Sequence, residues 1–376
     1  MTEAYIKLGE IATYINGYAF KPKDRGTEGL PIIRIQDLTG NSKDKGFYKG
    51  KYPSKIEINN GDILISWSAS LAVYVWNSGK ALLNQHIFKV LFDKKEINRD
   101  YFVYAVQFSL NKMKQLTHGA TMKHVMKKDF ENVLIPYPSL TEQRIIAYTL
   151  DKLKESMSKR LRELKKLDEL IKARFVEMFG DPRGNNFKWK QTSIKESCTL
   201  KSGKSLSSNI EKERGDIPYI KVKDMNSSKN TPYITTSSKF VKIENVKKQI
   251  LPAGTVIFPK RGGAIGTNKK RLTKLSICAD LNIMGVIPNI EKLNSQYLFA
   301  YFNTIDLKTL NNGSSVPQIN NKDIEPLSIS LPPLSLQNEF ANFVQQVDKS
   351  KFENIVYLNK TLSSKILSQI GDVIRD

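Results

Sequence analysis

Cysteine is scarce in this sequence of 376 residues, which contains only Cys198 and Cys278. Two cysteines so far apart form neither a disulfide scaffold nor the closely spaced pairs of a zinc knuckle. A chain of this length can bury the cores of two ordinary domains without covalent or metal cross-links. The protein is therefore expected in a reducing compartment, with no structural metal site.

Long apolar runs are also lacking. No stretch approaches the roughly 18 uninterrupted apolar residues that identify a membrane-spanning helix. From Met1 to Phe20 polar and apolar residues alternate, and no charged start is followed by an apolar segment, so the pattern is not that of a signal peptide. These features predict a soluble, cytoplasmic protein.

Familiar catalytic signatures are missing as well. Residues 203–205, Gly-Lys-Ser, match the end of a phosphate-binding loop, but Cys198 occupies the position of its first glycine. The nearest approach to the Asn/Asp-Pro-Pro-aromatic tetrapeptide of amino-methyltransferases is Asp-Pro-Arg-Gly at 181–184, which is typical of a helix end. The three histidines include no close helical pair of metal ligands. We therefore predict no catalytic residue, no metal site and no bound cofactor in this chain.

Positive charge, in contrast, is abundant. The chain has 59 Lys and Arg against 37 Asp and Glu, a formal net charge of +22, and a pI near 9.7. Such an excess is typical of proteins that bind a polyanion, above all nucleic acid. A generally basic soluble surface or a membrane-surface protein is the alternative, although the basic residues are spread along the chain and form no single polybasic tail.

The sequence contains an internal repeat, which indicates two similar domains. Residues 30–38 match 217–225, with proline, isoleucine, a basic residue and aspartate in register. Both copies are predicted to form a buried strand that is entered by proline and closed by aspartate. The further matches keep the same order: 61–65 with 254–258, 84–90 with 280–286, 118–121 with 312–315, 128–129 with 322–323, and 138–140 with 332–334.

Each copy is followed by apolar residues at every third or fourth position, which predicts long amphipathic helices over 141–180 and 335–376. A helix of about 38 residues is roughly 57 Å long at 1.5 Å per residue, longer than a compact domain of the remaining size. Pairing as a coiled coil is therefore favoured over the alternative of two core helices in one helical domain. The residues expected in this packing or in partner docking are Leu150, Leu153, Met157, Leu164, Leu167, Ile171, Val344, Val347, Leu358, Leu362 and Ile366.

A short link at 180–184 connects the first helix to the second domain, so the second helix must run back along the first. The predicted fold is α+β: two mixed, β-rich domains in a pseudo-twofold repeat, joined by two long helices that form an antiparallel coiled coil. Domains related in this way can present equivalent surfaces to two DNA half-sites. Because the two domains differ in sequence, the recognised site is expected to be asymmetric.

The junctions between domain and helix carry a family resemblance. Residues 135–146 read Ile-Pro-Tyr-Pro-Ser-Leu-Thr-Glu-Gln-Arg-Ile-Ile, and residues 331–337 read Leu-Pro-Pro-Leu-Ser-Leu-Gln. With this order of domains and helices, the chain resembles from end to end the specificity subunit of type I restriction-modification systems. The second junction departs from the pattern at Leu336, where glutamate is usual. The loop 313–319 also resembles that family, whereas 119–124 is more divergent.

The resemblance implies target-recognition domains at 1–140 and 181–334 and conserved helices at 141–180 and 335–376. It further implies a non-catalytic subunit whose domains each read one half of a bipartite, asymmetric DNA site, while the helices set the spacing and dock two methyltransferase subunits. The complex would methylate adenine or, with restriction subunits, cleave unmodified DNA. S-adenosylmethionine, ATP and Mg would belong to those partners. The alternatives are a DNA-binding regulator that acts alone and a nuclease or methyltransferase of an unrecognised kind.

Basic, glycine-containing loops are the places where we expect DNA contacts, because phosphates attract cations and glycine permits close approach. In the loop 260–271, Arg261 suits a guanine edge and the later basic residues suit phosphates. The matching loop of the first domain offers Trp67, which is equally compatible with a core position. The candidate DNA contacts are Arg34, Trp67, Ser68, Thr121, Lys123, Lys127, Lys128, Lys221, Lys260, Arg261, Gly262, Gly263, Thr267, Lys269, Lys270, Arg271, Ser314, Ser315 and Gln318.

Overall fold

A computed structural model describes residues 5–42, 44–68, 71–116, 126–181, 184, 187–310 and 316–369. The chain divides into two compact units. Unit 1 comprises Met1–Lys159 with Tyr357–Asp376, and unit 2 comprises Arg160–Val356. Among the described helices, none combines the length and the apolar character needed to cross a membrane.

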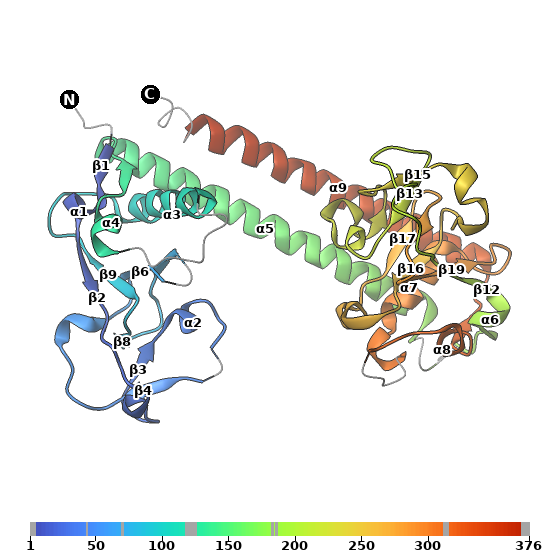
Figure 1. Ribbon diagram of the computed structural model, residues 1–376, viewed down its shortest axis with the longest axis horizontal. Coiled ribbons are helices and arrows are strands. Elements are labelled where there is room, and N and C mark those ends of the chain that lie inside the picture. Colours follow the sequence, from blue (N-terminus) through green and yellow to red (C-terminus); the bar gives the residue numbers. More distant parts are fainter. Residues whose placement is uncertain are drawn as a thin grey trace. The chain divides into compact units, whose positions relative to one another are not determined.

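Unit 1 is built on small sheets with one long domain helix (Figure 1). Its elements are β1 (Tyr5–Lys7), α1 (Leu8–Ile11), β2 (Thr13–Asn16), β3 (Leu30–Ile33), α2 (Ile35–Leu38), β4 (Gly46–Tyr48), β5 (Glu57–Ile58), β6 (Ile63–Ser66), β7 (Ala72–Val75), β8 (Ala81–Leu83), β9 (Ile87–Leu91), α3 (Arg99–Leu116), α4 (Lys127–Glu131) and β10 (Leu134–Pro136). One sheet has the order β2-β9-β6-β7 and another the order β4-β3-β8-β5, while β1 pairs with β10. Only the β3–β8 pair is parallel among the named strand pairs of this unit.

The main core of unit 1 lies where the first sheet packs against α3. Phe88 of β9, Phe102 of α3 and Ile135 of β10 are buried in one apolar cluster. The alternating burial of β2 and the apolar face of α3 explain this packing, because a strand and a helix each bury one side. In Figure 1 α3 lies beside the beginning of the long helix α5 (Leu140–Phe179), and Tyr104 Oη donates a hydrogen bond to Asp151 Oδ1 there.

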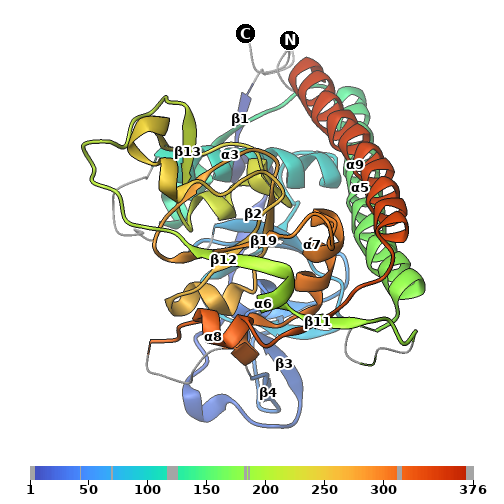
Figure 2. The same cartoon turned by 90° about the vertical axis from the view of Figure 1, so that its right-hand side faces the viewer.

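Unit 2 repeats this plan with further short elements. It contains β11 (Gln191–Ser193), α6 (Ile194–Ser197), β12 (Cys198–Ser202), β13 (Ile217–Ile220), β14 (Tyr233–Ile234), β15 (Phe240–Val241), β16 (Val256–Pro259), η7 (Gly262–Thr267), β17 (Arg271–Thr273), β18 (Cys278–Ala279), β19 (Ile283–Pro288), α7 (Ser295–Thr304), η8 (Leu307–Leu310), α8 (Asn321–Ile324) and β20 (Ser328–Ser330). The helix α9 (Leu334–Gln369) begins in unit 2, and its residues from Tyr357 on belong to unit 1. The largest sheet has the order β12-β19-β16-β17-β14, a second has β15-β13-β18, and β11 pairs with β20. Figure 2 shows β12 and β19 side by side.

The strand pairing confirms the internal repeat. The run β2-β9-β6-β7 of unit 1 corresponds to β12-β19-β16-β17 of unit 2, and the parallel pair β3–β8 corresponds to β13–β18. The turns agree as well: Gly61 and Gly254 precede β6 and β16 with φ of 87° and 83°, a left-handed conformation that favours glycine. The two units are therefore two copies of one mixed fold, as the repeat predicted.

One detail of the repeat was wrong. The expected strands over 30–38 and 217–225 end at Ile33 and Ile220, before the aspartates. Asp37 and Asp224 instead accept hydrogen bonds from the backbone N–H groups of Arg34 and Lys221, both at 2.9 Å. An aspartate that reaches back in this way stabilises a helical turn, so the repeated aspartate marks the turn after the strand.

The long helices begin one residue earlier than the sequence indicated, at Leu140 and Leu334. A capping box explains the first start: Ser139 N donates to Glu142 at 2.9 Å and Glu142 N donates to the Ser139 hydroxyl at 3.3 Å. The first helix ends at Phe179, and Gly180 follows with φ of 81°.

Within unit 2 the two long helices pack antiparallel, which confirms the predicted orientation. Arg160 Nη1 donates to Asn354 Oδ1 at 2.8 Å, and Arg174 pairs with Glu339 at 3.0 Å. Residue numbers thus rise along one helix as they fall along the other. The core of unit 2 extends onto these helices through Phe175 of α5.

Candidate nucleic-acid interface

The loop after β16 begins where two distant segments meet. Arg261 forms an isolated antiparallel β-bridge with Gln318, and Gly262 N donates to Pro317 O at 2.8 Å. Arg261 is exposed and lies at the N-cap of η7. A Cβ atom added to Gly262 or Gly263 would have no neighbour within 4 Å, so the backbone there is open to an approaching ligand. The structure therefore brings four of the predicted contact residues together at one exposed turn.

The same loop ends in a buried polar cluster. Asn268 adopts a left-handed conformation, with φ of 53°, and its Oδ1 accepts hydrogen bonds from Leu307 N and Lys270 Nζ, both at 2.8 Å. Lys270 Nζ also donates to Ile305 O. Since Ile305 precedes η8 and Leu307 is its first residue, these hydrogen bonds fix the end of η7 against the start of η8.

Two of the lysines predicted to contact DNA are buried. Lys260 is 9% exposed and Lys270 is 4% exposed. Lys260 Nζ donates to Ser202 Oγ at 2.6 Å. Burial lowers the pKa of Lys260, to which the charge of Arg261 adds, and burial lowers the pKa of Lys270 to about 8 even though Asp306 opposes the shift. Both ammonium groups thus have partners inside the protein.

The neighbouring candidates of this loop are also hydrogen bonded. Lys269 Nζ donates to Asn226 Oδ1, and Thr267 Oγ1 donates to Ala264 O. Arg271 donates to Lys270 O at 2.8 Å, and burial lowers its pKa. Among the basic residues of this loop, Arg261 is exposed, Lys269 and Arg271 are half-buried, and Lys260 and Lys270 are buried.

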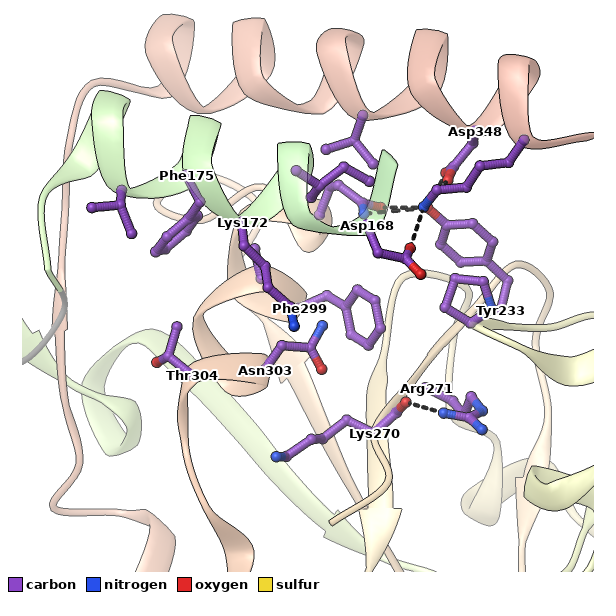
Figure 3. Close-up of a pocket in the computed structure, with 17 residues that line it drawn as sticks. Asp168, Lys172, Phe175, Tyr233, Lys270, Arg271, Phe299, Asn303, Thr304 and Asp348 are labelled. Atoms are coloured by element: carbon purple, nitrogen blue, oxygen red, sulfur yellow. Dashed lines mark hydrogen bonds and ion pairs between the residues drawn. The ribbon is translucent and has the colours of Figure 1, made fainter. Parts of the chain in front are cut away.

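Lys270 and Arg271 line a cavity of about 470 Å³ within unit 2 (Figure 3). Their side chains point in opposite directions, and Phe299 supplies part of an apolar wall. On the other side Tyr233 Oη donates to Asp348, and burial, together with Asp348, raises the pKa of that tyrosine. Apolar walls and charges of both signs give the cavity no single ligand preference.

In unit 1 the corresponding turn follows β6 and has different chemistry. Trp67 is half-buried, stacks on Phe88 with ring centroids 5.7 Å apart and donates to Asn16 Oδ1 at 3.3 Å. It therefore packs against the core and is partly accessible, and Ser68 beside it is half-buried. Lys127 and Lys128 are exposed in the first turn of α4.

Arg34 and Lys221 lie at equivalent positions, and both have acidic partners. Arg34 is 7% exposed and pairs with Asp37 at 3.1 Å, and Lys221 pairs with Glu211 at 2.7 Å. A DNA contact by either would require it to leave these partners. Four candidates, Thr121, Lys123, Ser314 and Ser315, lie outside the described residues.

The predicted helix-packing residues vary in burial. Leu153, Val344 and Val347 are buried, whereas Leu150, Met157, Leu164, Leu167 and Ile171 are half-buried. The side chains of Leu358, Leu362 and Ile366 lie outside the described part of the structure.

Sequence reasoning missed the role of two glutamines at the junctions. Gln143 and Gln337 are both fully buried. Gln143 Oε1 accepts from Asn98 N at 2.9 Å, and Gln337 Oε1 accepts from Asn294 N at 2.8 Å. Each glutamine thus connects the first turn of a long helix to the start of the domain helix α3 or α7. Their recurrence at matching positions of a divergent repeat was the signal available in the sequence.

A family model for the type I restriction modification DNA specificity domain matches residues 3–167 and 186–363. The chain is 26% identical over 377 residues to the type I restriction enzyme MjaVIII specificity subunit of Methanocaldococcus jannaschii, covering 91% of this chain and 85% of that protein. It is 29% identical over 170 residues to the type I restriction enzyme EcoBI specificity subunit of Escherichia coli, but that match spans 44% of this chain and only 35% of the relative.

Solved structures show the same fold. The S subunit of a type I restriction-modification system from M. genitalium superimposes with a TM-score of 0.56 at 16% identity, covering 96% of this chain and 92% of that one. A chain from a structural study of complex assembly and conformational transition in the type I R-M system gives a TM-score of 0.59 at 18% identity, covering 97% and 95%.

Proposed function

The chain belongs to the family of type I restriction modification DNA specificity domains, and from this premise we propose that its two units each read one half of a bipartite, asymmetric DNA site. The observation that supports the proposal is the combination of one repeated scaffold with different residues at equivalent turns. Unit 2 offers Arg261 after β16, whereas unit 1 offers Trp67 after β6. Equivalent folds can address two half-sites, and different side chains select different bases.

Arg261 is the residue to which we assign base reading in unit 2. It is exposed at a turn whose glycines leave room for a DNA backbone, and a guanidinium can donate two hydrogen bonds to the O6 and N7 of guanine. Exposed Lys127 and Lys128 are assigned to phosphates in unit 1.

The long helices are assigned to spacing and to docking of methyltransferase subunits. On the part of these helices in unit 2, the apolar side chains of Leu161, Phe352 and Ile355 are 58%, 67% and 45% exposed. Apolar side chains that are exposed on a helix surface can be covered by a partner protein when they form one patch. In this proposal the partners supply S-adenosylmethionine, ATP and Mg, methylate adenine and, with restriction subunits, cleave unmodified DNA.

Mapping methylated adenines tests the proposal directly. DNA from cells that carry this chain with its methyltransferase subunit is expected to show methylation at one asymmetric sequence of two parts separated by a fixed gap. Cells that carry Arg261→Ala should retain one half of that sequence and accept more bases in the other. Methylation at a continuous site, or no dependence on this chain, would refute it.

Copurification and activity assays distinguish the proposed function from its two alternatives, a DNA-binding regulator that acts alone and an unrecognised nuclease or methyltransferase. A regulator would purify and bind DNA without a methyltransferase, and an unrecognised enzyme would modify or cut DNA alone. We expect the purified chain to transfer no methyl group from labelled S-adenosylmethionine and to leave DNA uncut, whereas the complex with the methyltransferase subunit methylates adenine.

A further inference from the structure

The short helix η7 has a buried lysine next to each of its ends, and each lysine bonds the helix end to another segment. At its start, Lys260 Nζ donates to Ser202 Oγ at 2.6 Å, and Lys260 O accepts from Ile319 N at 2.9 Å. Lys260 therefore links the end of β16 to β12 and to the segment that carries Gln318. The exposed Arg261 is its direct chain neighbour.

At the other end of η7, Lys270 forms the corresponding hydrogen bonds. Its Nζ donates to Asn268 Oδ1 and to Ile305 O, and Asn268 Oδ1 also accepts from Leu307 N. Asn268 N in turn donates to Ile265 O at 2.9 Å and closes η7. One lysine thus joins the end of η7 to the residues that precede η8.

All of these acceptors are neutral. An ammonium ion inside a protein loses hydration, and neutral oxygens restore only part of it, which agrees with the lowered pKa of both lysines. A phosphate contact would require each Nζ to leave its acceptors and reach solvent from a side chain that is at most 9% exposed. The geometry therefore favours an internal role for both lysines.

We propose that Lys260 and Lys270 are positioning residues that hold η7 at its two ends, so that the exposed Arg261 meets DNA in one orientation, and that neither lysine contacts a phosphate. This inference rests on the proposed function. A positioning role and a phosphate-binding role predict different effects when the hydrogen-bond acceptor of a lysine is removed. Removing the acceptor disturbs the position of the lysine but leaves the charge that DNA meets unchanged. DNA binding should therefore change only if the lysine has a positioning role.

The test compares two pairs of variants in DNA binding by the complex with its methyltransferase subunit. Lys260→Met and Lys270→Met remove the ammonium groups but keep most of the side-chain volume. Ser202→Ala and Asn268→Gly remove their acceptors and leave every charge in place, and glycine accommodates the left-handed backbone at 268. Lys195→Met, at an exposed lysine of α6, is the control for loss of one charge.

Base preference is the main measurement. A bidentate arginine–guanine contact discriminates roughly 5- to 150-fold between bases, as converted from about 1–3 kcal/mol. Competition with duplexes that carry single-base changes should show that the two lysine variants and the two acceptor variants all lose at least about 5-fold of the preference in the half-site read by unit 2. Preference in the other half-site should be unchanged. Circular dichroism at the assay temperature confirms that each variant is folded.

The salt dependence supplies the second measurement. Each phosphate contact contributes about 0.9 to the slope of log K against log salt concentration. Lys260→Met and Lys270→Met should keep the wild-type slope. A slope reduced by about 0.9, with Ser202→Ala and Asn268→Gly indistinguishable from wild type, would overturn the positioning role and restore phosphate binding. If wild-type complex shows no base preference at all, the proposed function itself fails, which is a separate result.

Discussion

The lysines that flank η7 differ from the arginine beside them in what surrounds their charge. Arg261 is exposed, whereas Lys260 and Lys270 are buried among neutral oxygens from segments distant in sequence. The sequence showed a basic, glycine-containing loop and proposed Arg261 for a guanine edge, and the structure shows that this side chain is exposed. It could not separate the three cations, because burial here depends on Ser202 and Ile305, which tertiary folding brings to the loop.

The depressed pKa of Lys270 predicts a defined pH dependence of stability. Burial lowers this pKa to about 8, whereas lysine in an unfolded chain titrates near about 10.4. Between these values the unfolded chain binds more protons than the folded one, so the contribution of Lys270 to the free energy of unfolding rises with pH. Below about pH 8 both states are protonated and the contribution is constant. Lys270→Met should lack this rise.

Urea denaturation of wild type and Lys270→Met at about pH 7.5 and about pH 9.5 measures the effect. The difference in midpoint between the two proteins should shift in favour of wild type at the higher pH, whereas exposed Lys195→Met should stay parallel to wild type. Parallel behaviour of wild type and Lys270→Met across the whole range would show that Lys270 keeps an ordinary pKa.

The elements were predictable to different degrees for physical reasons. Helix α5 was evident because its apolar periodicity extends over many turns, and the repeat located β6 and β16 through their preceding glycines. The strands predicted near Arg34 and Lys221 are longer than the observed ones, because an aspartate that caps the next turn looks in sequence like the end of a strand. Short elements depend on such local hydrogen bonds, which composition alone does not reveal.

The junction glutamines lead to a prediction about how helix and domain are coupled. Gln337 makes three hydrogen bonds inside unit 2, accepting from Asn294 N at 2.8 Å and donating to Lys292 O and Pro332 O at 3.0 and 2.9 Å. Gln337→Met would leave these buried groups without partners, at a cost of about 1–3 kcal/mol each for those that water cannot reach. We therefore expect a destabilisation of roughly 2–4 kcal/mol for unit 2.

Gln143→Met provides the comparison in unit 1. Gln143 accepts from Asn98 N and donates to Pro138 O, so it makes two hydrogen bonds where Gln337 makes three, and its loss should cost less. Gln346→Met, at an exposed position of α9, should leave stability within about 0.5 kcal/mol of wild type. Hydrogen exchange at Asn294 and Asn98 would report each site separately, and unchanged protection in both glutamine variants would exclude the coupling.

At the scale of the whole molecule, the repeat was the most informative feature of the sequence. Matching segments in one order predicted two copies of a mixed fold, and the sheets of the two units share that topology. The sequence does not predict which bases each unit would select, because base choice in DNA-binding proteins depends on a few side chains and on their orientation toward DNA. In the proposed function these side chains include Arg261 and Trp67.

The proposed spacing role of α5 and α9 gives the last prediction. Four residues inserted near Leu164 and four near Leu358 should lengthen the helical pair by about 6 Å and nearly preserve its apolar face, since four residues are close to one turn. DNA rises about 3.4 Å per base pair, so the preferred gap between the half-sites should grow by roughly one to two base pairs. The insertion also rotates each helix by about 40°, so part of the affinity should be lost.

Mapping of methylated adenines is the measurement, and both half-site sequences should stay the same, because the turns that read them are unaltered. An insertion in only one helix is the control, since it disrupts the antiparallel register and should reduce methylation at every gap length. Full methylation at the original gap by the doubly extended chain would mean that the helices do not set the distance.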